Sequence, residues 1–332
     1  MILEKDSSVL GYPGETSKKL DADHHNICKY HSPSDPNYVS VRNALKSLVS
    51  KMVSSSKGNR DIVVSRSASL DLRSLLAVTE LPDIDYIYFR DQWVPGTSEW
   101  VLEDDDYLKW LDDSASAPSL LWIHGGAATG KSVLSSFIIN SLVEQGLLCQ
   151  YFFVRFGDQT KRTLSLLLRS LAYQIARCMP DFLQRALQLI DEAIDFETAD
   201  PRTIWERVFK HLLFNMEETR TLYWVIDGLD EADDPKAFIK LLSDIPSSSA
   251  QIKILLVGQK TPEIDASLHR IRKTLNRTYL GIEGHLQDFR SYVQQELNMS
   301  GTPEYRETIA QRLVVEAQNN FLVSTIRRKS RI

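Results

Sequence analysis

The sequence predicts an α/β fold in three layers, α/β/α, with a mostly parallel sheet between the helices. Three observations predict it. Apolar runs of strand length alternate with segments of helical periodicity, a glycine-rich turn joins the first run to a helix, and 43% of the 332 residues are hydrophobic. Strands that alternate with helices form parallel sheets covered on both faces, and this composition supplies a large core.

The part of the chain before the first predicted strand shows helices and turns. Residues 1–57 are polar and broken by glycine and proline, with one helix expected over about Val39–Val53. A second helix is expected over Ile62–Thr79, where four leucines provide an apolar face. Residues 95–111 begin with a Pro-Gly turn and continue as an aromatic-rich stretch, which we call the approach segment.

Four strands and five helices are expected next. The strands are the apolar runs Leu120–Ile123, Leu147–Val154, Leu222–Ile226 and Ile252–Val257. The helices are expected over residues 131–144, 163–178, 181–194, 202–216 and 235–243. Residues 163–178 give a long helix, because their leucines recur at helical spacing and Pro180 follows as a stop. Residues 286–328 are expected to be helical, without further strands.

The glycine-rich turn reads Gly-Gly-Ala-Ala-Thr-Gly-Lys-Ser and has the spacing of a phosphate-binding loop, the Walker A motif. Glycine lets successive main-chain N–H groups point at an anion, and the start of the next helix adds its own N–H groups. We expect Lys131 to reach the β- and γ-phosphates of a nucleotide and Ser132 to ligate Mg²⁺. A glycine-rich turn without a ligand is the alternative, but the strand and helix on either side favour the phosphate site. The predicted cofactor contacts are Gly125, Gly126, Ala127, Ala128, Thr129, Gly130, Lys131, Ser132 and Val133.

A second motif, Val-Ile-Asp-Gly-Leu-Asp-Glu-Ala, follows the run Leu222–Ile226 and corresponds to Walker B. Asp227 follows four apolar residues and stands at the carboxyl end of a predicted strand, where ligands bind in open α/β sheets. We expect Asp227 to hold Mg²⁺ directly or through water, and Asp230 or Glu231 to polarise an attacking water. The alternative is an acidic helix N-terminus, where carboxylates are favourable without any ligand.

Together these two motifs resemble the NACHT family of signal-transduction P-loop NTPases, part of the STAND class. The closest resemblance is to the nephrocystin-like modules of fungal NLR-like proteins, and it extends from about Leu81 to Leu322. It includes the approach segment and Phe152-Phe153 at the end of the second strand. The resemblance implies a P-loop NTPase fold used as a switch, in which ADP holds a closed form and exchange for ATP opens it. It also implies that residues 97–100 lie near the adenine.

The resemblance gives the chain four parts. They are a degenerate N-terminal segment similar to the tail of a lipase-like domain (1–57), a helical linker with the approach segment (58–116), the NTPase core (117–265) and a helical lid fragment (266–332).

Two departures from the family pattern affect the expected activity. The family usually places an arginine that senses the γ-phosphate after the fourth strand, but this chain has Gln259 there. Glutamine carries no charge, and an arginine in this role can raise the rate about 10³-fold, so hydrolysis is expected to be slow or absent. The sequence also stops where relatives continue into a sensing half, which predicts a truncated member.

Charge and composition set expectations for the partners and the compartment. A net charge of −5 gives no basic field, so we expect no nucleic acid as a partner. No apolar run approaches 18 residues, so no membrane span is expected. Three cysteines and no signal peptide fit a cytoplasmic protein. The resemblance adds self-association or pairing with related NACHT proteins.

The sequence thus predicts an ATP/ADP-binding switch with slow Mg²⁺-dependent hydrolysis in a regulatory or innate-defence protein. The predicted catalytic residues are Asp230, Glu231 and Gln259, and the predicted metal ligands are Ser132 and Asp227. One rival is a non-hydrolysing or nucleotide-free fragment that acts as an interaction or decoy module. A second rival is a P-loop phosphotransferase, for which the sequence shows no basic substrate cleft.

Overall fold

The computed structural model describes residues 41–42, 72–112, 119–188, 195–217, 220–248, 251–271, 275–282, 288 and 290–292. The chain divides into two units, Met1–Val63 and Val64–Ile332, and the fold below belongs to the second. The helix expected over 39–53 and most of the helical segment expected over 286–328 lie outside the described residues. Of the helix expected over 62–79, residues 72–75 are described and helical.

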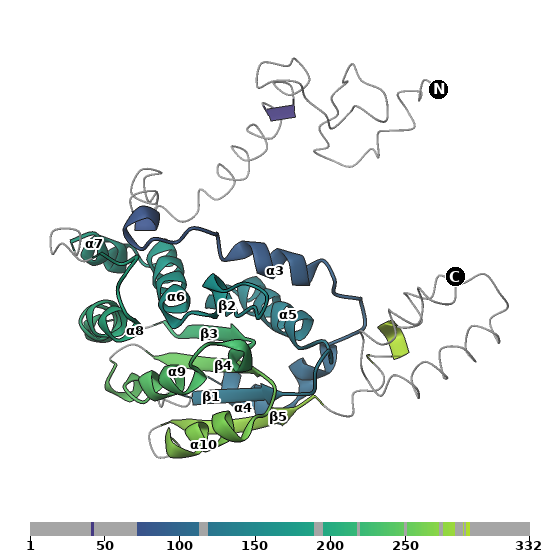
Figure 1. Ribbon diagram of the computed structural model, residues 1–332. Coiled ribbons are helices and arrows are strands. Elements are labelled where there is room, and N and C mark those ends of the chain that lie inside the picture. Colours follow the sequence, from purple (N-terminus) through teal and green to yellow (C-terminus); the bar gives the residue numbers. More distant parts are fainter. Residues whose placement is uncertain are drawn as a thin grey trace, which may run out of the picture. The chain divides into compact units, whose positions relative to one another are not determined.

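A five-stranded parallel sheet forms the centre of the second unit (Figure 1). Its strands are β1 (Ser119–His124), β2 (Leu148–Phe153), β3 (Leu222–Asp227), β4 (Ile252–Gly258) and β5 (Asn276–Gly281). The order across the sheet is β2-β3-β4-β1-β5, and all four pairings are parallel. The α/β prediction with a mostly parallel sheet is confirmed. The carboxyl ends of the strands lie along one edge, where Asp227 is in register with Phe153 and Val257.

The strand β5 was not predicted, because residues 266–332 were expected to be a helical lid. It pairs with β1 along its whole length and therefore belongs to the sheet. Its sequence is mostly polar, and only Leu280 is buried. The apolar-run criterion failed because β5 lies at the edge of the sheet and needs few apolar residues.

Helices connect and cover the strands. The α-helices of this unit are α3 (Asp83–Arg90), α4 (Asp105–Leu111), α5 (Lys131–Glu144), α6 (Leu164–Cys178), α7 (Pro180–Gln188), α8 (Pro201–Ile204), α9 (Pro235–Leu242) and α10 (Pro262–Arg270). Short 3₁₀ turns cover Glu99–Glu103, Thr160–Arg162, Leu213–Asn215, Leu229–Glu231 and Ile245–Ser247. Residues 288 and 290–292 are helical as well. The predicted helices over 131–144, 163–178 and 235–243 are therefore present within a residue or two.

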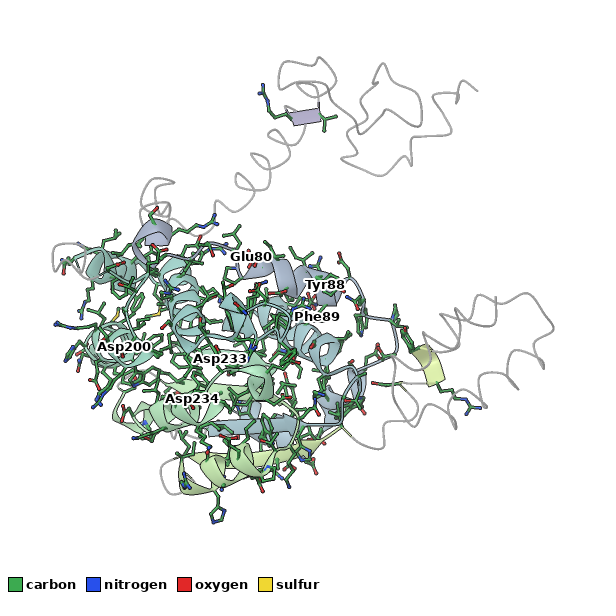
Figure 2. All side chains as sticks on the ribbon, in the orientation of Figure 1. Glu80, Tyr88, Phe89, Asp200, Asp233 and Asp234 are labelled. Atoms are coloured by element: carbon green, nitrogen blue, oxygen red, sulfur yellow. The ribbon has the colours of Figure 1, made fainter. Side chains whose placement is uncertain are left out.

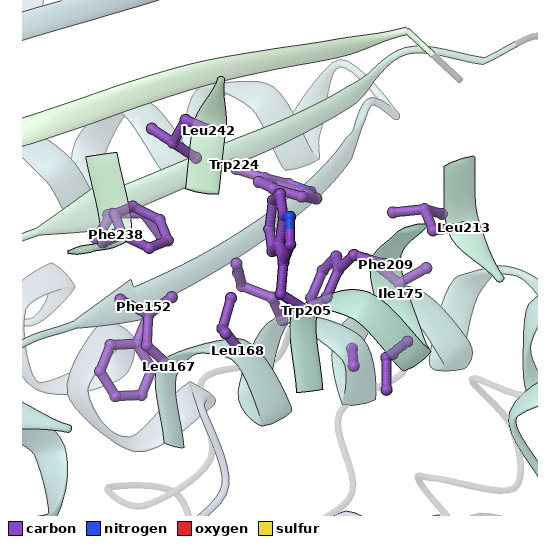
Figure 3. Close-up of a cluster of buried hydrophobic side chains, with 14 of the residues drawn as sticks. Phe152, Leu167, Leu168, Ile175, Trp205, Phe209, Leu213, Trp224, Phe238 and Leu242 are labelled. Atoms are coloured by element: carbon purple, nitrogen blue, oxygen red, sulfur yellow. The ribbon is translucent and has the colours of Figure 1, made fainter. Parts of the chain in front are cut away.

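The expected helix over 202–216 is interrupted. It begins as α8, where Asp200 caps the first turn, and continues as a π-helix over Trp205–Lys210. The π-turn belongs to the aromatic core on one face of the sheet, in which Trp205 stacks on Phe209 at 4.9 Å and meets Trp224 of β3 edge to face (Figure 3). Periodicity alone does not distinguish these helix types, because both keep an apolar face.

Both faces of β1, β3 and β4 are buried, as is usual for the inner strands of a parallel sheet. Along β1, Leu120 and Trp122 join the core beneath α6, while Leu121 and Ile123 join the core beneath α5. The open edge at β2 is covered by Gln174 of α6. Its amide donates to the carbonyl of Tyr151 at 2.7 Å and accepts from the N–H of Tyr151 at 3.0 Å. This pairing satisfies main-chain groups that an edge strand leaves open.

A buried lysine joins β4 to α4. Lys253 is 2% exposed, and its ammonium donates to the main-chain carbonyls of Leu111 and Asp112 at 3.1 and 2.6 Å. These carbonyls lie at the C-terminal end of α4, where the helix dipole favours a cation. The contact fixes the helix of the approach segment against the sheet.

Candidate functional site

The glycine-rich loop leaves β1 and turns sharply into α5. Its backbone adopts left-handed angles at Ala128 (φ 56°) and Gly130 (φ 83°), the residue that precedes α5. The N–H of Gly125 donates to the carbonyl of Gly258 at 3.2 Å, which ties the loop to the end of β4. The free N–H groups at the start of α5 therefore face the carboxyl edge of the sheet, where they favour an anion.

Lys131 is the first residue of α5, and its side chain folds back over the loop. The ammonium donates to the carbonyls of Gly125 at 3.1 Å and Gly126 at 2.5 Å. Burial lowers the pKa of Lys131, and the nearby carboxylate of Asp230 opposes that shift. A phosphate within the loop would give this partly desolvated cation a charged partner in place of two neutral carbonyls.

Asp227 ends β3 and is 3% exposed. Ser132 donates to one carboxylate oxygen at 2.6 Å, and Ser135, one turn along α5, donates to the other at 2.8 Å. Burial raises the pKa of Asp227 to about 6, although the two serine hydrogen bonds oppose the shift. Hydroxyl and carboxylate oxygens are hard ligands suited to Mg²⁺, so this pair fits the cation predicted for it.

The two other acids of the second motif are held by main-chain N–H groups. Gly228 has a φ of 72° and turns the chain into the 3₁₀ segment Leu229–Glu231. The carboxylate of Asp230 accepts the N–H of Gln259 at 2.8 Å, and that of Glu231 accepts the N–H of Phe156 at 2.6 Å. Both acids therefore have fixed positions between the ends of β2 and β4.

These groups meet around one cavity of about 780 Å³. Its lining includes Ala127, Ala128, Thr129, Gly130, Lys131, Ser132, Val133, Asp227, Asp230, Glu231 and Gln259. Gly125 and Gly126 are absent from the lining and contribute carbonyls to Lys131 instead. The structure thus gathers the predicted residues from three loops that are far apart in sequence.

The approach segment forms another wall of the cavity through Thr97, Ser98 and Trp100. Asp288 fixes that wall, since its carboxylate accepts the N–H of Ser98 at 2.6 Å and the indole N–H of Trp100 at 3.0 Å. Trp93 also lines the cavity, and its ring stacks on Phe137 of α5. The walls are thus aromatic at this end and charged at the loop end.

Sequence reasoning missed three groups in the site: Ser135, Trp93 and Arg155. Ser135 could have been found, because it lies three residues after Ser132 and shares its side of α5. Arg155 lines the cavity just after β2. Its nearest charged partner, Asp85, is 70 residues away in sequence and unpredictable from local pattern.

Comparison with known proteins places the matched region over this site. Residues 96–259 match the family model described as nephrocystin 3, N-terminal. No curated protein gave a significant match. The chain is similar to the Aeropyrum pernix ORC1 protein in complex with DNA, with 14% identity over 82% of this chain and 62% of that chain and a TM-score of 0.41.

Two further solved structures show the same distant similarity. AMPPCP-bound DnaA from Aquifex aeolicus has 13% identity over 72% of this chain and 62% of that chain, with a TM-score of 0.38. Drosophila ORC bound to GC-rich DNA and Cdc6 has 12% identity and a TM-score of 0.35; the match covers 73% of this chain but 36% of the ORC chain. These are likenesses of fold.

The expectation that nucleic acid is excluded as a partner is corrected by these findings. It rested on the net charge of −5. The similar structures include proteins bound to DNA, so we withdraw the exclusion.

Among the described residues, no helix is both long and apolar enough to cross a bilayer.

Proposed function

We propose that this chain, which contains a NACHT-like P-loop NTPase module of the nephrocystin 3 N-terminal type, binds ATP and ADP with Mg²⁺ and serves as a conformational switch. The switch would belong to a regulatory or innate-defence protein of the NLR-like class. Its two states would differ in whether the third phosphate is present. Hydrolysis by the same site would return it slowly to the ADP form.

The contact between Ser132 and Asp227 supports this proposal most strongly. A hydroxyl at the start of α5 and a buried carboxylate at the end of β3 lie 2.6 Å apart, beside Lys131. A fold without a ligand gains little from burying this carboxylate, because burial alone penalises its charged form. A divalent cation bound to both oxygens would remove that penalty and neutralise nucleotide phosphates.

Slow hydrolysis is the expected chemistry of the remaining groups. Asp230 and Glu231 line the cavity at fixed positions, so either carboxylate could orient a water toward the terminal phosphate. Gln259 lines the same wall but supplies no positive charge for the transition state. We therefore expect the protein to bind nucleotide and to hydrolyse it only slowly.

A non-hydrolysing interaction module is the second candidate. One observation favours it: each of the two acids already accepts a main-chain N–H, so part of its hydrogen-bonding capacity is engaged by the fold and is not directed at a water. The same experiment separates the two candidates. Phosphate release from Mg·ATP is measured for the wild type, Asp230→Asn and Glu231→Gln, with nucleotide binding followed in parallel.

Release that falls about tenfold or more in one variant, with binding unchanged, is the result expected of a slow hydrolase. Binding without any release supports the non-hydrolysing module. Failure of the wild type to bind either nucleotide, while Lys131→Ala behaves identically, contradicts the switch and leaves the nucleotide-free form of the interaction module.

A further inference from the structure

Arg155 is a cationic group of the cavity with no role assigned so far. Of the described residues that line the cavity, two carry cationic side chains, Lys131 and Arg155. Lys131 belongs to the glycine-rich loop, whereas Arg155 comes two residues after β2 on the wall that carries the acids. A triphosphate carries more negative charge than Lys131 and one Mg²⁺ together neutralise. A second cationic side chain in the cavity can therefore bind the remaining charge.

The backbone around Arg155 is fixed on both sides. The N–H of Val154 donates to the carbonyl of Asp227 at 2.9 Å, and the N–H of Phe156 donates to the carboxylate of Glu231 at 2.6 Å. Residues 154–156 therefore run beside the acidic turn. Of these three residues only Arg155 has a polar side chain, and it starts from the side of the site where the acids would act on the terminal phosphate.

The guanidinium is presently held by Asp85 of α3. Its Nε and Nη2 donate to one carboxylate oxygen of Asp85 at 3.0 and 2.7 Å. It also packs over the rings of Phe89 and Tyr88, at 4.4 and 5.2 Å from their centroids; both rings are labelled on α3 in Figure 2. Two thirds of the Arg155 side chain is covered, and one third remains exposed.

Asp85 has a second cation, so it would not be left unpaired if Arg155 moved. The ammonium of Lys161 lies 2.6 Å from its other oxygen and 2.7 Å from Glu80. The side chain of Asp85 is 12% exposed, and an unpaired charge there would be costly. With Lys161 in place, the exchange of one anionic partner of Arg155 for another has a small cost.

We propose that Arg155 is a phosphate-binding residue that distinguishes ATP from ADP, and that Asp85 is a positioning residue which competes for it. The inference rests on the proposed nucleotide site. Arg155 turns from Asp85 to the terminal phosphate when ATP is bound and returns when ADP is bound. Because Asp85 lies on α3, the number of phosphates is thereby linked to the contacts of that helix.

The test compares affinities for Mg·ADP and for a non-hydrolysable ATP analogue with Mg²⁺, by calorimetry on the full chain. Arg155→Gln is expected to weaken binding of the analogue about tenfold or more, as for loss of a charge-assisted hydrogen bond, and to leave ADP within about twofold. Arg177→Gln is the matched control. Arg177 also pairs with α3, through Asp83 at 3.4 Å, but it is not among the residues that line the cavity.

Asp85→Asn gives an opposite prediction. Removal of the competing carboxylate is expected to strengthen binding of the ATP analogue several-fold relative to ADP. The gain corresponds to the free energy of the ion pair with Arg155, which no longer has to be broken when the analogue binds. If Arg155→Gln fails to fold by circular dichroism, Arg155→Lys is measured instead, since it keeps the charge but loses the fork that binds two oxygens.

The outcomes separate this inference from the proposed function. Equal losses for both nucleotides in Arg155→Gln, or no loss for either, overturn the discriminating role while nucleotide binding by the wild type stands. An unchanged or lowered preference for the analogue in Asp85→Asn overturns the competition. A wild type that binds neither nucleotide overturns the proposed function itself.

Discussion

Replacement of Asp227 with asparagine is expected to stabilise the nucleotide-free protein at neutral pH. Asp227 is buried at the end of β3, and its oxygens accept hydrogen bonds from Ser132 and Ser135. Asparagine has nearly the same shape and keeps a hydrogen-bonding group toward each serine, but it carries no charge. The change therefore removes the cost of a buried carboxylate and little else.

The magnitude follows from the pKa of Asp227, which burial raises from 3.8 to about 6. Each pKa unit corresponds to about 1.4 kcal/mol, so the ionised form costs the folded state about 3 kcal/mol at pH 8. As pH falls through 6, the folded protein binds a proton that the unfolded chain binds only near 3.8, and this stability is recovered. About 2 kcal/mol of it should return by pH 4.5.

Urea unfolding of the wild type and Asp227→Asn at pH 8 and pH 4.5 measures this effect. The advantage of the variant should be about 3 kcal/mol at pH 8 and about 1 kcal/mol at pH 4.5. Comparison between the two proteins cancels the titration of the other carboxylates. An advantage that is equal at both pH values, or a variant less stable than the wild type at pH 8, would refute the reasoning.

Three further substitutions test the packing that positions the site, each by urea unfolding. Gly258→Ala would place a Cβ against the carboxylate of Asp230. We expect the free energy of unfolding to fall by about 1 kcal/mol and the carboxylate to be displaced. An unchanged position of Asp230 in a crystal structure of the variant would contradict this. Gln174→Leu should lower the free energy of unfolding by about 2 kcal/mol, because the main-chain groups of Tyr151 lose the hydrogen bonds of the Gln174 amide at the sheet edge. Lys253→Met should lower the free energy of unfolding by about 2 kcal/mol, because the carbonyls of Leu111 and Asp112 lose the hydrogen bonds of the ammonium. A stabilised variant would show that the cost of burying the ammonium outweighs those bonds.

The sequence predicted the parts of the fold that are buried on both faces. The runs that became β1, β3 and β4 are almost entirely apolar, because helices cover both sides of each strand. The polar strand β5 was missed because an edge strand needs few apolar residues. The π-helix at Trp205 was missed because it keeps an apolar face like that of an α-helix, so the periodicity of the sequence does not separate the two.

The candidate site divides in the same way. The glycine-rich loop and Asp227 were predictable, since their chemistry depends on neighbours in sequence and on the strand and helix beside them. Arg155 was not, because its place depends on main-chain hydrogen bonds to Asp227 and Glu231 and on its contact with Asp85. Such contacts arise only when distant loops meet at the edge of the sheet.

The nucleotide content of the purified protein tests the central proposal most directly. The wild type and Lys131→Ala are extracted with acid, and the released nucleotides are quantified by chromatography. We predict ADP in the wild type and its loss in the variant, because the ammonium of Lys131 lies at the loop where the phosphates would bind. An empty wild type that also fails to bind added Mg·ATP would contradict the proposed switch.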